Sequence, residues 1–319
     1  MSTIEKAVEK LGKKSSGKPK NPDAVDDFIA DDFRAEPAPA SFVDDAVAIR
    51  PDAAQGRVNN KEIIELPLSR LAELGVITPD KPRTQIAEEY RAIKRPLLRN
   101  IAGEGAGAIE NPNLIMVTSS LEGEGKTFSA VNLMMSMSME SNKTVLFVDA
   151  DVAKASSSRM LGVSDDAPGL IDVLQHDEIG IEDVLLQSNI PNIRLIPAGH
   201  VNDRATELLA SDRMLRLMEE LSSRYPDRII IFDSPPLLQT SEANVLANLM
   251  GQIVFVVEAE KTAKDAVAQA VGQISDDKVV GMVLNKARQY PWDTHLYGRG
   301  YGYGYGYGSD RVRAGEDRS

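Results

Sequence analysis

Short apolar runs alternate with helix-period segments over the C-terminal two-thirds of the chain. Six runs of strand length, rich in Val, Ile, Leu and Phe, lie after residue 112, and most are separated by stretches of helical periodicity. They read NLIMVTSS, KTVLFVDAD, IRLIPAG, DRIIIFDSPP, QIVFVVEAE and KVVGMVLNK. Near-continuous apolar strands are typical of a parallel sheet that is covered on both faces. We therefore predict an α/β fold with a doubly wound, mostly parallel sheet and helices on both faces.

The first 100 residues have a different pattern. Residues 1–20 combine six lysines with apolar residues at helical spacing, which predicts a short basic amphipathic helix that is either solvated or docks on a partner or membrane surface. Residues 21–60 are rich in Asp, Ala and Pro without periodicity, and predict a disordered linker. The run IAEEYRAIKRPLL predicts a helix that Pro96 should kink or end, because an interior proline loses a backbone hydrogen bond.

Composition narrows the possible function classes. The net charge of −12 argues against a nucleic-acid binder, which needs a basic face. The chain has no cysteine, no apolar run near the roughly 18–20 residues that span a bilayer, and no hydrophobic signal segment. We expect a cytoplasmic protein that reaches a membrane only through a partner or a surface helix.

A phosphate-binding motif follows the first strand. The segment SLEGEGKT, residues 120–127, matches G-x-x-x-x-G-K-[ST] except that Ser120 replaces the first glycine. Glycines let successive backbone N–H groups turn toward one anion, and the following helix adds the partial positive charge of its N-terminus. Lys126 should reach the β- and γ-phosphates and Thr127 should bind Mg²⁺. We therefore predict ATP and Mg²⁺ as ligands of a P-loop NTPase-type fold, with contacts from Ser120, Glu122, Gly123, Glu124, Gly125, Lys126, Thr127 and Phe128.

Polar residues end three further strands. Asp149 and Asp151 end the second strand, and Asp233 ends a later one. These acids can hold Mg²⁺ or position an attacking group, although a single acid after a strand is often only a helix cap. Asn285 ends the last strand, where its amide could pair with a base edge or cap locally.

The combination of motifs resembles a known family. SLEGEGKT, VLFVDADVAK, IIIFDSPP and a tyrosine-rich tail are similar to the bacterial tyrosine kinases (BY-kinases) of exopolysaccharide synthesis, and most of all to the stand-alone cytoplasmic type associated with exosortase systems. The resemblance covers roughly residues 80–307. It implies an N-terminal region 1–80, a kinase domain 81–290 and a flexible tyrosine-rich tail 291–319.

The resemblance also implies roles for particular residues. Lys126, Asp149, Asp151 and Asp233 would be catalytic, with Asp149 the base for a tyrosine hydroxyl and with Thr127, Asp151 and Asp233 near the metal. It implies ring-like self-association through Glu88, Arg91 and Lys94, and a membrane polysaccharide co-polymerase (chain-length determinant protein) as activator. Two positions depart from the family pattern. Ala153 replaces an arginine and is followed by Lys154, and Leu98 stands where the self-association motif has a basic residue.

The C-terminal segment alternates tyrosine and glycine. Its tyrosines are Tyr297, Tyr301, Tyr303, Tyr305 and Tyr307. By composition this is a sticky low-complexity tail, whereas beside a nucleotide site it becomes the expected phosphoacceptor. Its reach allows phosphorylation within a subunit or between neighbours. We predict an ATP-dependent tyrosine autokinase that regulates exopolysaccharide synthesis or export.

Two other functions remain as alternatives. A partitioning or septum-positioning ATPase uses the same fold, but such proteins carry a signature lysine where this chain has Leu121. A non-catalytic scaffold whose assembly depends on nucleotide is favoured only by the missing arginine at Ala153.

Overall fold

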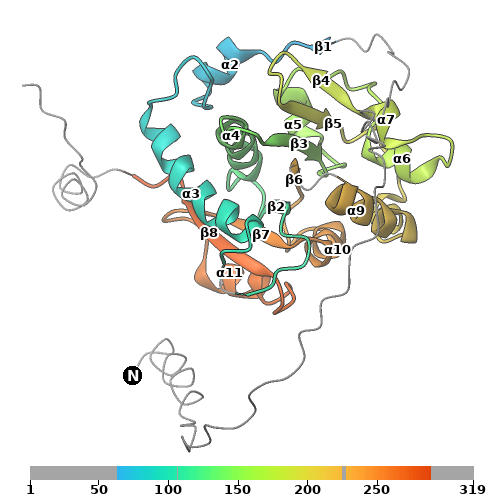
Figure 1. Cartoon of the computed structure of the whole chain (residues 1–319). Helices are drawn as coiled ribbons and strands as arrows, with labels where there is room; N and C mark the ends of the chain where they lie inside the picture. The colour runs from blue at the N-terminus through green and yellow to red at the C-terminus, as the bar shows by residue number, and fades with distance from the viewer. Residues whose placement is uncertain (1–62, 106, 225–227, 289–319) are drawn as a thin grey trace, which may run out of the picture. The chain divides into compact units, whose positions relative to one another are not determined.

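The computed structural model describes residues 63–105, 107–224 and 228–288, which build a twisted sheet between two layers of helices (Figure 1). In this part of the chain the sheet has eight strands, and all neighbouring pairs are parallel except one. The antiparallel pair is β4–β5. In spatial order the strands are β1 (Ile63–Ile64), β4 (Leu186–Ser188), β5 (Ile193–Ile196), β3 (Thr144–Asp149), β6 (Arg228–Asp233), β2 (Leu114–Ser119), β7 (Gln252–Glu258) and β8 (Val279–Asn285). The predicted doubly wound, mostly parallel sheet is confirmed.

The strand register brings the predicted polar residues to one edge of the sheet. Asp233 of β6 lies opposite Asp149 of β3 and opposite Val117 of β2, two residues before β2 ends. On the other side of β2, Glu258 of β7 lies opposite Asn285 of β8. Because parallel strands end on the same side, this edge gathers the loops that carry ligands in doubly wound sheets.

Apolar side chains cover both faces of the sheet, as the unbroken apolar runs require. Successive residues of β2 point to opposite faces, so Leu114 and Met116 join one apolar cluster and Ile115 and Val117 join the other. The described helices are α2 (Leu68–Glu73), α3 (Gln85–Ile101), α4 (Lys126–Ser138), α5 (Ser156–Met160), α6 (Leu170–Gln175), α7 (Ile181–Val184), α8 (Ala205–Leu209), α9 (Asp212–Arg224), α10 (Ser241–Leu249) and α11 (Lys264–Val271). Helices α2, α3 and α4 cover one face, and α6, α8, α9, α10 and α11 cover the other.

Helix α3 continues through Pro96 and ends only at Ile101, so of the two predicted outcomes, a kink or the end of the helix, the second is wrong. Pro96 and Ala92, whose carbonyl loses its partner, are both exposed, and water can satisfy that carbonyl. On the opposite side of the helix Tyr90 and Leu97 are buried. This packing offsets the lost hydrogen bond.

Residues 63–80 pack on the same domain, although the sequence placed the start of the domain at residue 81. Leu71 of α2 is fully buried, Ile77 is nearly so, and the Ile77 N–H donates to the Asn132 Oδ1 of α4 at 2.9 Å. The predicted amphipathic helix, the predicted linker of residues 21–60 and the tyrosine tail lie outside the described residues. Among the residues described, no helix is both long and apolar enough to cross a membrane.

Candidate nucleotide-binding and catalytic site

The loop between β2 and α4 has the backbone of a phosphate cradle. Gly123 and Gly125 have φ of +85° and +97°, in the left-handed region that residues with side chains rarely adopt. A Cβ on Gly125 would lie 2.0 Å from the Asn285 Nδ2, whereas a Cβ on Gly123 would meet nothing within 4 Å. Helix α4 then begins at Lys126, so its free N–H groups face the loop.

Side chains from three segments hold this loop in place. The nearly buried Glu124 carboxylate accepts a hydrogen bond from the Leu121 N–H at 2.7 Å and contacts the Thr262 hydroxyl. The Asn285 Nδ2 donates to the Glu124 carbonyl at 2.9 Å, and the Lys286 Nζ donates to the Gly123 carbonyl at 2.6 Å. Asn285 therefore lies at the predicted site, where it supports the loop. Sequence reasoning missed Thr262 and Lys286, although both follow strand ends.

Lys126 lies among the predicted acids. Its side chain is nearly buried, and its Nζ lies 2.5 Å from the Asp151 Oδ2. Burial alone would lower the pKa of Lys126, but the charges of Asp233 and Asp151 outweigh it and raise that pKa. Lys126 therefore stays protonated. Its ammonium can exchange the Asp151 carboxylate for the phosphate oxygens of a bound nucleotide.

Asp233 is completely buried, and neither of its carboxylate oxygens has a hydrogen-bond partner within 3.5 Å among the described residues. Burial raises the pKa of Asp233 to about 7, and Asp149 adds to the rise, whereas Lys126 and the nearby Thr127 hydroxyl oppose it. Unpartnered acceptor oxygens beside a phosphate loop have the chemistry that suits Mg²⁺ and its water ligands.

The predicted metal residues fit Mg²⁺ as it binds together with nucleotide phosphates. Within the described ranges no three His, Cys, Asp or Glu side chains form a closed metal site. Mg²⁺ usually takes one or two carboxylates, with phosphates and water as its other ligands. Thr127, Asp151 and Asp233 can supply that limited protein share. The Ser120 Oγ, which is also buried and has no hydrogen-bond partner among the residues that the structure describes, is a further polar atom at the loop.

Asp149 is held by a residue that sequence reasoning did not identify. The Ser158 N–H and hydroxyl both donate to the Asp149 Oδ2, at 2.8 and 2.6 Å. Burial raises the pKa of Asp149, although the bonds from Ser158 oppose the rise. Ala155 precedes α5 with a φ of +45°, a strained conformation for a non-glycine residue, and this turn directs Ser158 toward the aspartate.

The remaining predicted loop residues divide between the loop surface and the core. Glu122 is exposed and forms an ion pair with Lys154. Lys154 therefore brings a positive charge to the loop next to Ala153, the position that departs from the family pattern. Phe128 packs against the apolar cluster below α4, so only its backbone can face a phosphate.

The predicted self-association residues of α3 do not form one exposed surface. Glu88 and Arg91 are a surface ion pair. Lys94 is buried, where it donates to the Ser136 carbonyl at 2.7 Å and pairs with Glu140 at 2.6 Å. The i, i+3, i+6 spacing turns Lys94 toward α4, because six residues advance a helix by 600°, which leaves Lys94 about 120° from Glu88.

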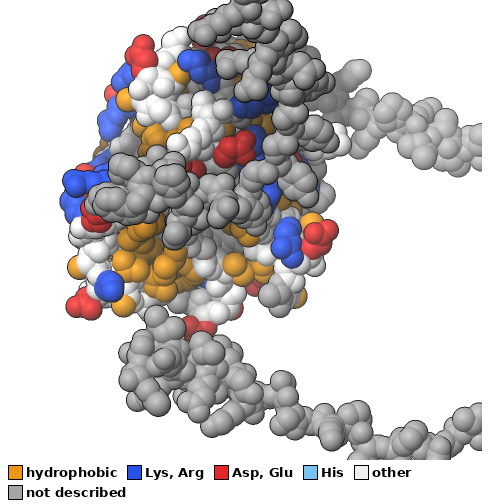
Figure 2. Space-filling model, turned by 90° about the vertical axis from the view of Figure 1, so that its left-hand side faces the viewer, with side chains coloured by type: hydrophobic (Ala, Val, Ile, Leu, Met, Phe, Trp, Pro, Cys, Tyr) orange, Lys and Arg blue, Asp and Glu red, His pale blue; other side chains and the backbone are white. Residues whose placement is uncertain are grey.

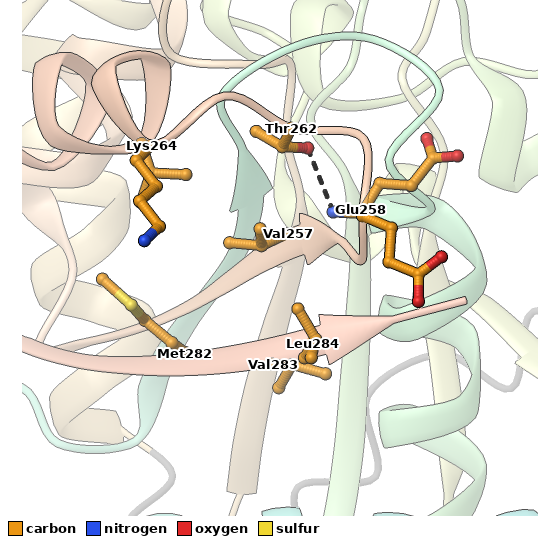
Figure 3. Close-up of a pocket in the computed structure, with 9 residues that line it drawn as sticks. Val257, Glu258, Thr262, Lys264, Met282, Val283 and Leu284 are labelled. Carbon is orange, nitrogen blue, oxygen red and sulfur yellow. Dashed lines mark hydrogen bonds between the residues drawn. The ribbon is translucent and has the colours of Figure 1, made fainter. Parts of the chain in front are cut away.

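A separate apolar groove lies at the β8 edge of the sheet. The face with α3 and β8 shows gathered hydrophobic side chains (Figure 2), and Met282 and Leu284 of β8 are more than half exposed. The groove, of about 380 Å³, is lined by β7, β8 and the start of α11 (Figure 3). At its rim the Glu258 N–H donates to the Thr262 Oγ at 3.2 Å. The groove is lined in part by Thr262, which contacts Glu124 of the phosphate loop. The predicted acids and Lys126 are not among the residues that line it.

A left-handed glycine loop before a helix, a buried lysine and acids at the neighbouring strand ends define a nucleotide-binding P-loop protein. The chain belongs to the AAA domain family (AAA_31), whose profile matches residues 113–280, and its relatives place it with the bacterial tyrosine kinases.

The similarity to kinases is seen in both sequence and structure. The chain is 29% identical over 212 residues to tyrosine-protein kinase YwqD of Bacillus subtilis (strain 168). The matched region covers 66% of this chain and 85% of the relative. It is 31% identical over 190 residues to putative tyrosine-protein kinase EpsB of Ralstonia nicotianae (strain ATCC BAA-1114 / GMI1000), covering 59% of this chain and 24% of that longer protein. The crystal structure of the VpsO kinase domain matches with a TM-score of 0.51 and 27% identity, covering 64% of this chain and 100% of the domain.

Proposed function

We propose that the chain is an ATP-dependent protein-tyrosine kinase that phosphorylates the tyrosines of residues 297–307, in its own tail or that of a neighbouring subunit. The observation that carries this proposal is the placement of Lys126 between the phosphate loop and the buried acids Asp149, Asp151 and Asp233. The kinase names of the relatives support the same reaction.

The chemistry follows from what these residues can do with ATP as substrate. The tyrosine oxygen attacks the γ-phosphorus, the bond from that phosphorus to the bridging oxygen breaks, and ADP leaves with the electron pair. Asp149, which Ser158 holds through Oδ2, accepts the phenolic proton. Lys126 moves from Asp151 to the transferred phosphoryl group and stabilises its charge. When bound, Mg²⁺ neutralises the β- and γ-phosphates, and Thr127, Asp151 and Asp233 would hold it or its water.

The wider role that we propose is the regulation of exopolysaccharide synthesis or export by a stand-alone, exosortase-associated kinase. The similarity to YwqD over most of that protein's length supports a short kinase of this kind. A membrane polysaccharide co-polymerase would be the activator, and copies of the chain would associate. Five phosphotyrosines would add about −8 to −10 charges, which the acids of the site would repel. Phosphorylation would thereby release a bound tail.

Intact-mass measurement after incubation with Mg·ATP tests the function. We expect phosphate increments that disappear when the five tail tyrosines are replaced by phenylalanine, and none in Lys126→Ala. Mixing Lys126→Ala chains with wild type then tests exchange between subunits, since phosphate on the inactive chain requires a neighbour. ADP production without phosphotyrosine would support the ATPase alternative, and neither product would support the scaffold.

A further inference from the structure

The outer edge of β8 presents an apolar surface. Met282 and Leu284 are 60% and 64% exposed, and both line the groove of about 380 Å³ between β8 and the start of α11. They project from the same face of the strand (Figure 3), and Val257 and Val267 line the groove beside them. Among the described strands β8 is the last of the sheet, so none of them pairs with its outer edge. This edge can therefore accept both apolar side chains and a further strand.

The backbone groups of Met282 and Leu284 also face outward. Where β7 and β8 end, the Ala259 N–H donates to the Asn285 carbonyl at 2.9 Å. In a parallel ladder the N–H and C=O of one residue point to the same side, and successive residues alternate between the two sides. The odd-numbered residues of β8 therefore face β7, and the backbone groups of Met282 and Leu284 point to the open edge.

The chain leaves the described part of the structure at the rim of this groove. Lys286 has a φ of +57°, so the backbone turns directly after β8. The Arg288 Nε then lies 4.0 Å from the Oε2 of Glu260, a residue that lines the groove. The next residues include Tyr290 and Trp292, the latter being the single tryptophan of the chain. Two large aromatic residues thus follow the strand whose apolar edge is open.

The spacing of the two aromatic residues matches that of the edge. Pro291 favours an extended conformation for the residue before it, and residues two apart in an extended chain share a face. If the chain runs back antiparallel to β8, a loop of five residues (289 − 284) places Tyr290 opposite Leu284. Trp292 then lies opposite Met282. In this register the backbone nitrogen of Pro291 points away from β8, so the missing N–H costs no ladder hydrogen bond.

We propose that residues 289–292 of the same chain fold back along the open edge of β8 and bury the rings of Tyr290 and Trp292 in the groove. This docking anchors the start of the tyrosine-rich tail beside the phosphate loop, because Thr262 lines the same groove and contacts Glu124 of that loop. It shields Tyr290 and leaves the later tyrosines free. The role goes beyond the proposed kinase reaction and does not depend on it.

Short covalent distance favours this occupant over a second copy of the chain. The four residues from Arg288 to Trp292 (292 − 288) span up to about 13–14 Å when extended. Met282 lies three residues, about 10 Å, before the end of β8, and is therefore within reach. A segment on so short a tether has an effective concentration in the millimolar range.

Charge does not favour a different segment of the chain. Residues 258–288, which include the rim of the groove, contain equal numbers of acidic and basic residues. A surface without net charge does not attract the lysine-rich residues 1–20 in particular. Aromatic rings suit this groove better, because its walls are apolar and its rim is polar.

The fluorescence of Trp292 tests the docking, because no other tryptophan contributes. The full chain is titrated with acrylamide without nucleotide, and the quenching of the emission is followed. Leu284→Glu places a charge in the groove at an exposed position, and Leu215→Glu at an exposed position of α9 is the matched control. We expect Leu284→Glu to raise the quenching constant about threefold and to shift the emission to longer wavelength, since the indole becomes exposed to water. Leu215→Glu should change neither value.

Cysteine pairs test the register. The chain has no cysteine, so an introduced pair forms the only disulfide. Leu284→Cys with Tyr290→Cys places the two Cβ atoms opposite each other on one face. Leu284→Cys with Gln289→Cys places them on different faces. We expect the first pair to form an intrachain disulfide about tenfold faster than the second under mild oxidation.

Three results would overturn the inference. The first is a quenching constant in the unmodified chain equal to that of Leu284→Glu. The second is equal rates of disulfide formation for the two cysteine pairs. The third is protection of Trp292 that increases with protein concentration, which assigns the groove to a second copy. None of these measurements needs ATP or phosphotyrosine, so the docking and the proposed kinase function can fail separately.

Discussion

Replacement of Asp233 by asparagine should stabilise the nucleotide-free protein while it abolishes phosphorylation. Asp233 is fully buried, and its pKa is raised from 3.8 to about 7, so the native state favours the protonated acid. The stability contributed by that proton is fully present below pH 4 and is lost as the pH rises through 7. At 1.36 kcal/mol per tenfold change, the raised pKa of Asp233 reduces the free energy of unfolding by about 4 kcal/mol at pH 8 and by about 2 kcal/mol at pH 5, where the carboxyl ionises only in the unfolded state. The pKa of about 7 for Asp233 already includes the attraction between its carboxylate and the Lys126 ammonium.

Urea unfolding of wild type and Asp233→Asn at pH 5 and pH 8 measures this effect. We expect the variant's gain in the free energy of unfolding to be about 2–3 kcal/mol larger at pH 8 than at pH 5. Asp165→Asn, at an exposed acid, is the matched control and should stay within about 0.5 kcal/mol of wild type at both values. A gain that does not depend on pH, or a loss at pH 8, would refute the argument that the buried carboxylate is poorly solvated in the empty site.

The remaining predictions concern positioning and packing. Ser158→Ala removes one of the two hydrogen bonds to Asp149 and should lower kcat. The acidic limb of the pH–rate profile should move to higher pH, because the pKa of Asp149 rises further without that bond. An unshifted profile would argue against Asp149 as the base. Lys94→Met leaves the Ser136 carbonyl and Glu140 without their partner at the end of α4. Thermal unfolding should show a free energy of unfolding lower by about 1–3 kcal/mol. An unchanged free energy would mean that the buried ammonium is dispensable. Gly125→Ala should weaken nucleotide binding, measured by calorimetry, more than Gly123→Ala, since both strain the backbone but only the first places a Cβ against Asn285; equal effects would assign the whole cost to φ.

The sequence by itself determined the sheet, the phosphate loop and the strand ends that carry Asp149, Asp151 and Asp233. Parallel strands end on one side, so acids that directly follow two such runs must come to the same edge. The motif spacing around Lys126 likewise requires a turn between a strand and a helix, and the structure has that turn. These features depend on local periodicity and on a topological rule, both of which can be read along the chain.

Only the tertiary structure decided how those residues are supported. Ser158 lies nine residues from Asp149, and Thr262 and Lys286 reach the phosphate loop from more than 130 residues away, so no local pattern reveals them. The same holds for Lys94, whose spacing suggested a surface motif but whose side chain is buried against the end of α4. Burial, hydrogen-bond partners and the left-handed turn at Ala155 arise from contacts between distant segments. They become visible only when the sheet brings those segments together.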